Sequence, residues 1–302
     1  MSPTGESQLP LQWYVAFLAA CSMLPWAGGC GPAEEAATSL RVDGSDTMVN
    51  LAQAWAETYH KRHRDVSVQV LGSGSGVGIA SLTDGNCDMA NSSRKMTEKE
   101  LKRVREKQRI DAKEHIVGYD AMAVYVHPGN PIESISIEEL KEIYGRDGAI
   151  TKWSELGVAN PLADKIIRVS RQNSSGTYAY FRSTVLGKGS DYKLGSIDAN
   201  GSKDVVALVS RTPTAIGYSG MGYQTPDVKV LKVAKTRGRP GVPPTAENAI
   251  KGLYPITRPL IIYTLGEPTG PVKQYLDWIL SSEGQAIVEQ LGYVPVGSHD
   301  AH

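Results

Sequence analysis

From Ser39 onward, segments with the alternation of β-strands are followed by segments with the apolar spacing of helices. The first strand-like segment is 40–43, and the helix-like segment 48–59 follows it directly. The strand-like segments 66–71 and 87–90 are each followed by a helix-like segment in the same way. Because strands joined by crossover helices are the basic unit of α/β folds, this order predicts mainly parallel sheets flanked by helices.

The chain has 302 residues, which exceeds one typical domain, so we expect two α/β lobes. The segment 116–126 is long enough to cross from one lobe to the other, with Gly118 as a candidate pivot. Another strand-like segment, 258–264, comes late in the chain. This distribution predicts a two-stranded hinge between a first lobe of residues 39–117 and 251–302 and a second lobe of residues 118–250.

The N-terminus has the pattern of an export signal. Residues 11–26 are apolar, too few to span a bilayer comfortably, and are followed by small residues and Cys30. We expect a lipoprotein-type signal peptide at 1–30, lipidation of Cys30 and a polar tether at 31–38. Cys21 is the alternative lipidation site. The leader has no Lys or Arg before its apolar run, which points to an unusual leader or a misplaced start codon. A buried N-terminal helix is the structural alternative.

The charge balance excludes some classes of partner. Lys+Arg and Asp+Glu both number 32, so the formal net charge is zero. No overall basic field is available to attract nucleic acid or an acidic membrane, and any anion selectivity must be local. The third cysteine, Cys87, forms neither a disulfide framework nor a metal-ligand spacing with the two in the leader. We expect Cys87 to be a small, buried apolar residue.

Residues 171–177 place an arginine, hydroxyls and a glycine between a strand-like and a helix-like segment. The unpaired amides at the start of a helix attract anions. Arg171 adds a permanent charge and a planar donor fork that matches phosphate-like oxygens, and Ser175 and Thr177 add hydroxyl donors. The alternative is an ordinary helix cap formed by Ser174 or Ser175, with Arg171 solvated at the end of the strand.

Three further strand ends carry polar groups of the same kind. The first strand ends in residues 44–47, which we expect to cap the helix that begins at Met48, so that the Thr47 hydroxyl and the first amides face one spot. The glycines of residues 72–76 let the backbone approach a ligand closely, and Ser73 supplies a hydroxyl. Residues 91–94 end the third strand with two more hydroxyls. Because ligands of open α/β sheets bind at the carboxyl ends of the strands, we expect these loops to converge on one oxyanion site.

The motifs of nucleotide binding and of hydrolysis are missing from the sequence. There is no Gly-x-x-x-x-Gly-Lys-Ser/Thr, and the glycine run at 72–78 has no acidic residue about twenty positions later at a strand end. None of the six histidines lies in the four loops, and His60 and His63 fit the polar face of a helix. A phosphatase would need a nucleophile with a base, or a metal cluster. We therefore expect no enzyme activity, no cofactor and no metal.

Over residues 39–296 the sequence resembles the type II solute-binding proteins of the high-affinity phosphate ABC transporter, the Pst-type phosphate receptors. The motif Arg171-x-x-x-Ser175-Gly176-Thr177 is the most specific part of the resemblance. The runs at 44–48 and 72–74 and the closing pattern Trp278…Tyr293-Val294-Pro295 agree in order and position. The resemblance implies a two-lobed type II periplasmic-binding-protein fold that closes over one dehydrated phosphate. It also implies the ligand-binding residues Thr47, Met48, Ser73, Ser93, Arg171, Ser175, Gly176 and Thr177.

The sequence departs from this family at Ser93, where many relatives have an aspartate that accepts the proton of hydrogen phosphate. An ionised carboxylate only accepts hydrogen bonds and so favours a protonated oxyanion over sulfate, whereas a serine can accept or donate. Asp46 and the Ser93 hydroxyl are the two candidate proton acceptors. A plain capping role for Asp46 stays open. A receptor for sulfate, molybdate or tungstate is therefore the alternative within binding proteins.

The function that we expect is that of an exported phosphate receptor, lipid-anchored in the periplasm or at the surface of a bacterium. It would deliver phosphate to the permease subunits of an ABC transporter, as a monomer and with no nucleic-acid partner. A phosphatase or phosphotransferase is the alternative from another class. A phosphate sensor that meets no permease also stays open, because the sequence has no readable docking motif.

Overall fold

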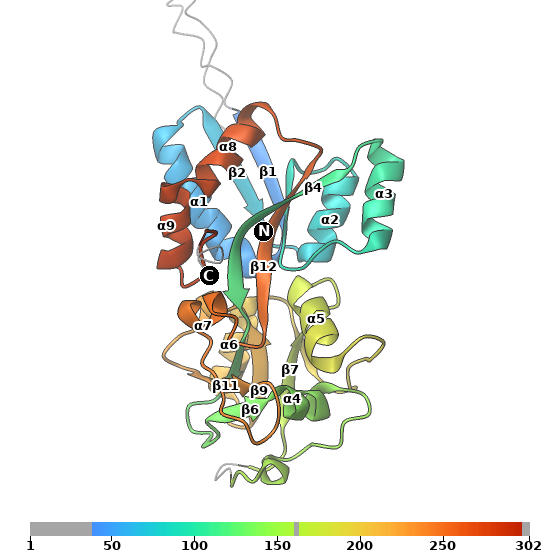
Figure 1. Ribbon diagram of the computed structural model, residues 1–302, viewed down its shortest axis with the longest axis vertical. Coiled ribbons are helices and arrows are strands. Elements are labelled where there is room, and N and C mark those ends of the chain that lie inside the picture. Colours follow the sequence, from blue (N-terminus) through green and yellow to red (C-terminus); the bar gives the residue numbers. More distant parts are fainter. Residues whose placement is uncertain (1–37, 160–162, 298–302) are drawn as a thin grey trace, which may run out of the picture. The chain divides into compact units, whose positions relative to one another are not determined.

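A computed structural model describes residues 38–159 and 163–297, and two five-stranded sheets organise them (Figure 1). The strands of the first sheet, in spatial order, are β2 (Val66–Leu71), β1 (Thr38–Gly44), β3 (Met89–Ser92), β12 (Thr257–Leu265) and β4 (Ala112–Ala121). Those of the second sheet are β10 (Lys229–Val230), β5 (Ala123–Val126), β9 (Ala215–Ser219), β7 (Ile167–Arg171) and β8 (Ile197–Ala199). A small separate sheet pairs β11 (Lys232–Ala234) with β6 (Ser134–Ser136).

Both large sheets are mixed. In the first sheet β1 pairs in parallel with β2 and β3, while β12 runs antiparallel to β3 and β4. In the second sheet β7 is parallel to β8 and β9, while β5 is antiparallel to β9 and β10. The α/β fold with two helix-flanked sheets is confirmed, and the parallel pairings that we predicted make up half of each sheet. Every antiparallel pairing involves β5 or β12, whose direction is set by the connections between the sheets.

Two strands connect the sheets. β4 ends at Ala121 and β5 starts at Ala123, so the chain passes straight from the first sheet to the second. β12 pairs with β4 over its full length, and Figure 1 shows the two strands side by side. On β4, a Cβ added to Gly118 would lie 3.1 Å from the Val294 carbonyl oxygen and 3.2 Å from a methyl of Val288. Close packing therefore explains the glycine that we proposed as a pivot.

Helices cover both faces of the first sheet (Figure 1). The helices that pack on one face are α1 (Val49–Arg62), α8 (Gly270–Leu280) and α9 (Ser282–Gln290). Those on the other face are α2 (Ser75–Thr83) and α3 (Glu98–Gln108). The two faces are buried in separate apolar clusters, centred on Trp55 and Tyr59 on one side and on Leu82 and Val104 on the other.

The second sheet is also covered on both faces. One face packs against α4 (Ile137–Tyr144), α5 (Gly176–Phe181), the π-helical turn η3 (Arg182–Leu186) and α7 (Ala246–Ile250). The other face packs against α6 (Ser202–Arg211). Short 3-10 turns complete the described elements: η1 (Asp46–Met48), η2 (Trp153–Leu156) and η4 (Met221–Tyr223). Ser136 caps α4 with a reciprocal hydrogen bond to Glu139, which explains why this helix starts where its sequence pattern begins.

The predictions for Cys87, for the N-terminal segment and for the lobe boundaries have different outcomes in the structure. Cys87 is buried and unpaired, as expected. Thr38, the last residue of the predicted tether, already belongs to β1. The signal peptide at 1–30, Cys21, Cys30 and the rest of the tether lie outside the described residues. Both sheets belong to one compact unit, so the lobe boundaries stay a prediction. Among the described residues, no helix has the length and apolar character needed to cross a bilayer.

Gly78 tests how tightly α2 packs on β1. A Cβ at this position would lie 2.3 Å from the Gly44 Cα and 2.6 Å from the Asp43 carbonyl oxygen, and neither backbone atom can rotate away. We expect Gly78→Ala to lower the free energy of unfolding by about 1–3 kcal/mol, despite a helix-propensity gain of about 1 kcal/mol. Urea unfolding measures this difference. Gly76→Ala is the matched control in the same helix, since the nearest heavy atom lies at 3.2 Å; equal stability of the two variants would refute the packing argument.

Candidate functional site

Buried polar side chains from both sheets meet where β1, β3 and β7 end. β1 ends at Gly44 and β3 at Ser92, side by side because the two strands pair in parallel. β7 of the second sheet ends at Arg171, and the hydrogen bond of this residue to Asp46 joins its carboxyl end to theirs. We call this cluster the polar junction, and its members are Asp46, Thr47, Ser75, Ser93, Asp120, Arg171, Ser175, Gly176, Thr177, Ser202 and Arg258. All of them except Asp46 are almost inaccessible to solvent.

Hydroxyl groups make direct contacts between the two sheets. The Oγ1 atoms of Thr47 and Thr177 lie 2.8 Å apart, the first from the end of β1 and the second from α5. The Ser75 Oγ accepts a hydrogen bond from the Ser93 amide at 3.1 Å and lies 3.4 Å from the Ser93 Oγ. A Cβ on Gly176 would lie 2.2 Å and 2.5 Å from these two serine oxygens. The glycine is therefore required for α5 to approach the first sheet.

The N-terminus of α5 points into the polar junction. Ser175 is the N-cap, and its Oγ accepts from the amides of Thr177 and Tyr178 at 3.1 Å and 3.5 Å. The capping role that we considered for Ser175 is therefore present. The accompanying alternative for Arg171, a solvated arginine, is wrong, because this side chain is only 1% exposed.

Arg171 is held by groups from both sheets. Its Nη2 donates to Asp46 Oδ1 at 3.0 Å and to the Asn200 carbonyl at 3.2 Å, and its Nη1 donates to Ser202 Oγ at 3.0 Å. The Nε atom is buried and has no hydrogen-bond partner among the described residues. Burial lowers the pKa of Arg171, while the Asp46 carboxylate opposes this shift. A buried guanidinium with a spare donor is suited to an anionic ligand.

Asp46 faces the second sheet. Besides Arg171, its Oδ1 accepts from the Ser202 amide at the start of α6, at 2.5 Å. Its backbone carbonyl accepts from the Tyr223 hydroxyl at 2.7 Å. A plain capping role that faces away from the site is therefore wrong. The carboxylate neutralises Arg171 and the partial positive charge of a helix start at the same time.

Arg258 and Asp120 are the charged site residues that sequence reasoning missed, and Ser75 and Ser202 were missed as well. The two charged residues are completely buried, and the Nε and Nη2 atoms of Arg258 donate to Asp120 Oδ2 at 3.0 Å and 2.8 Å. Arg258 also donates to the hydroxyls of Thr177, at 3.0 Å, and Thr47, at 3.2 Å. A signal was available, because each charge lies in an apolar, strand-like segment. Charged side chains are rarely fully buried unless they are paired.

Two predicted ligand residues, Ser73 and Met48, do not present their predicted donor groups to the polar junction. Ser73 is exposed, and its hydroxyl donates to the Asp43 carboxylate. Ser75, two residues later, occupies the polar junction instead. The Met48 amide donates to the Ser45 carbonyl at 3.0 Å within the turn η1. The predicted residues that do meet are Thr47, Ser93, Arg171, Ser175, Gly176 and Thr177, with Asp46 beside them.

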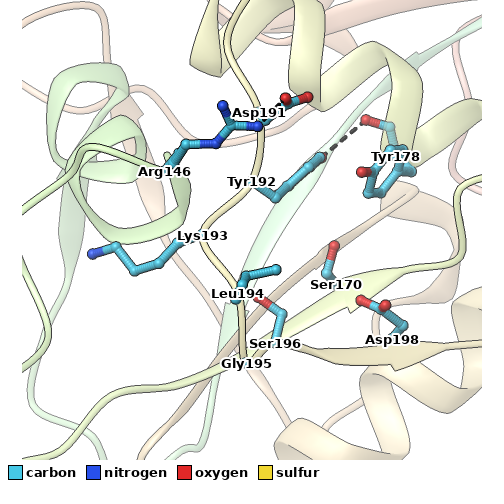
Figure 2. A pocket seen from close by; sticks show the side chains of 10 residues that line it. All are labelled: Arg146, Ser170, Tyr178, Asp191, Tyr192, Lys193, Leu194, Gly195, Ser196 and Asp198. Carbon is cyan, nitrogen blue, oxygen red and sulfur yellow. Dashed lines mark hydrogen bonds and ion pairs between the residues drawn. The ribbon is translucent and has the colours of Figure 1, made fainter.

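A separate pocket lies on the face of the second sheet that is opposite to the Arg171 side chain. Figure 2 shows it, with a volume of about 300 Å³ and with Arg146, Tyr178 and Tyr192 among its lining residues. Ser170 also lines it, but its hydroxyl pairs with the Tyr218 hydroxyl at 2.8 Å. Because successive side chains of a strand point to opposite faces, Ser170 faces away from its neighbour Arg171. This pocket therefore does not belong to the polar junction.

The chemistry of the polar junction is that of an anion site. Hydroxyls, a helix N-terminus and two guanidinium groups converge, and each of the two carboxylates is already paired with an arginine. Within residues 38–159 and 163–297, no group of three or more His, Cys, Asp or Glu side chains is arranged to hold a metal ion. The arrangement can bind a small oxyanion through many hydrogen bonds at once.

Comparison with known proteins gives the family. The model of the PBP superfamily domain matches residues 31–283. The chain is 35% identical to the phosphate-binding protein PstS of Pseudomonas aeruginosa, over 84% of this chain and 81% of the relative. It is 37% identical to PstS of Bacillus subtilis, over 87% and 82%. A Clostridium perfringens substrate-binding protein assigned to phosphate ABC transport, solved with bound phosphate, superposes with a TM-score of 0.77 at 30% identity, covering 86% of this chain and 100% of that one. The chain therefore belongs to the Pst-type family of phosphate-binding proteins.

Proposed function

We propose that this protein binds inorganic phosphate at the polar junction and delivers it to the permease of a phosphate ABC transporter. The observation that carries the proposal is the burial of Arg171 together with the hydroxyls of Thr47, Ser93, Ser175 and Thr177, which come from both sheets. A dehydrated phosphate loses all its hydrogen bonds to water. Only a site with many preorganised donors can compensate for that loss.

The proposed ligands follow from the geometry of this cluster. Arg171 supplies charge, Ser175 and Thr177 supply hydroxyls, and the Gly176 amide supplies a backbone donor at a helix start. The Thr177 amide stays a proposed donor that would exchange the Ser175 Oγ for the anion. Thr47 and Ser93 face them from the first sheet. Ser75 takes the role that we had predicted for Ser73, because only Ser75 contacts Ser93. Met48 stays a proposed ligand through its amide, which would exchange the Ser45 carbonyl for the anion.

Asp46 and Ser93 stay the proposed acceptors of the phosphate proton. The Oδ1 atom of Asp46 already accepts from Arg171 and from the Ser202 amide, so Oδ2 is the oxygen proposed to accept that proton. If neither residue accepts it, the junction contains mainly donors and would suit sulfate, molybdate or tungstate equally well. Selectivity among tetrahedral oxyanions therefore depends on these two side chains.

Parts of the chain outside the polar junction would supply the hinge and the membrane anchor of the receptor. The paired strands β4 and β12 would be the hinge between the two lobes, and the leader with Cys30 would anchor an exported monomer to a bacterial membrane. A receptor is favoured over a phosphatase because described histidines are engaged elsewhere: His60 with the Val66 carbonyl at 2.8 Å and His115 with Thr264 at 2.9 Å. A sensor role without a permease would use the same site.

A binding measurement tests the ligand. Calorimetric titration with phosphate, arsenate, sulfate and molybdate is expected to give the tightest binding for phosphate. Arg171→Gln should weaken phosphate binding about tenfold or more, because a hydrogen bond to a charged group contributes about 1.5–3 kcal/mol. Arg168→Gln is the matched control, since it removes the same charge from the same strand outside the junction. Tighter binding of sulfate or molybdate, or turnover of a chromogenic phosphoester, would refute the proposal.

Gly176 tests the position of the site. In Gly176→Ala the new methyl group would displace the hydroxyls of Ser75 and Ser93, which lie 2.2 Å and 2.5 Å from it. We expect phosphate affinity to fall about tenfold or more, as for the loss of one or two hydrogen bonds. Ser183→Ala, in the helical turn that follows, should bind phosphate like the parent. Unchanged affinity of Gly176→Ala would place the anion elsewhere.

Asp46→Asn tests the proton acceptor. The amide keeps one acceptor oxygen for Arg171, but the nitrogen in place of Oδ2 only donates and cannot accept a hydrogen bond from hydrogen phosphate. We expect the ratio of phosphate affinity to sulfate affinity to fall about tenfold, roughly the value of one hydrogen bond to a charged group. Competition titrations of the two anions measure this ratio. An unchanged ratio would leave the Ser93 hydroxyl as the acceptor.

A further inference from the structure

We propose that Arg258 is a second anion-binding arginine of the polar junction and that Asp120 is its built-in counter-ion; this inference rests on the proposed function. The motif of residues 171–177 accounts for one arginine only. Arg258 lies far from it in the sequence, on β12, and yet it donates to the hydroxyls of Thr47 and Thr177. These are the two proposed ligand groups that bring the sheets into direct contact.

The orientation of the guanidinium group separates its two tasks. Its Nε and Nη2 atoms donate to Asp120 Oδ2, while Nη1 and Nη2 donate to the threonine hydroxyls. One edge of the planar fork therefore faces the carboxylate and a second edge faces the site. Asp120 is fixed in turn, because its Oδ1 accepts from the Met221 amide at 2.9 Å. Such a guanidinium is preorganised, and little rotamer freedom remains to be lost when an anion binds.

Arg258 limits the hydrogen bonds that the hydroxyls of Thr47 and Thr177 can still make. Each hydroxyl has one proton to donate and two lone pairs. Arg258 donates to both oxygens, so a lone pair on each is used. The two oxygens lie 2.8 Å apart, so one of the two protons is shared between them. The other proton is left to donate, and the threonine pair as a unit presents a donor. One lone pair also stays free, on the hydroxyl that donates the shared proton. The other hydroxyl has both lone pairs occupied and can only donate, which suits an oxyanion.

The charges in the junction support the same assignment. Arg258 and Asp120 are both completely buried, and each would be costly to bury alone. With Arg171 and Asp46, the junction contains two positive and two negative side chains. Its net charge is therefore zero even when no anion is bound. Burial lowers the pKa of Arg171, and the positive charge of Arg258 adds to this shift. An anion placed at the threonines would interact with both guanidinium groups.

Variants of the two partners separate a role in binding from a role in stability. If the pair were only structural, removing either charge should weaken phosphate binding alike. In our proposal the two changes act in opposite directions. Arg258→Gln is expected to weaken phosphate binding about tenfold or more, and Asp120→Asn to strengthen it about tenfold, because Arg258 then lacks its counter-ion. Calorimetric titration with inorganic phosphate at fixed salt concentration measures both constants.

Because a single change leaves one charge buried and unpaired, the double variant Arg258→Gln/Asp120→Asn is the decisive one. It is neutral, close in shape to the parent pair, and expected to unfold in urea near the parent midpoint while binding phosphate about tenfold or more weakly. Arg258→Lys, which keeps the charge and loses the fork, is expected to fall between the parent and the double variant. If the double variant does not fold, this lysine variant decides: parental affinity would overturn the inference.

The controls distinguish this inference from the proposed function. A parent protein that binds phosphate and a folded double variant that binds it equally well would overturn the role of Arg258 alone. Equal weakening by Arg258→Gln and Asp120→Asn would also overturn it. A parent protein that binds no phosphate would overturn the proposed function and this inference with it.

Discussion

The ion pair between Arg258 and Asp120 is the interaction on which the rest of the structure depends. The two residues face each other across β12 and β4, the strands that join the sheets, and neither is accessible to solvent. A buried charge is tolerated only with its partner in place. The pair therefore fixes the register of β12 against β4 at the place where the chain passes from one sheet to the other. The same guanidinium then holds one threonine from each side, so connection and site share a single anchor.

Much of the fold could be predicted from the sequence because its long elements have a clear period. The strand at 66–71 was predicted with the bounds that the structure gives it. The short strands β6 and β8, with three residues each, were missed, because so few residues show no period. The mixed pairing of both sheets also escaped, since the direction of a strand follows from the path of the chain between the sheets and not from local alternation.

The candidate site was predicted where it depends on local motifs and missed where it depends on distant pairs. Arg171, Ser175 and Thr177 lie within one loop and helix start, so their joint role could be inferred from spacing alone. The choice between Ser73 and Ser75 required the path of a glycine-rich loop, which the sequence leaves free. Arg258 and Asp120 are 138 positions apart, and only the pairing of β12 with β4 brings them together.

The two arginines differ in where their counter-ions come from. Asp120 lies on the strand beside Arg258, so this pair stays intact if the sheets move apart. Asp46 follows the first sheet whereas Arg171 ends a strand of the second, so the same movement would break their contact. Separation of the sheets therefore disrupts one ion pair and spares the other. The dissociation rate of an anion held between them is thus coupled to the lifetime of the contacts that join the sheets, and among these the ion pair of Asp46 with Arg171 is the one that separation breaks.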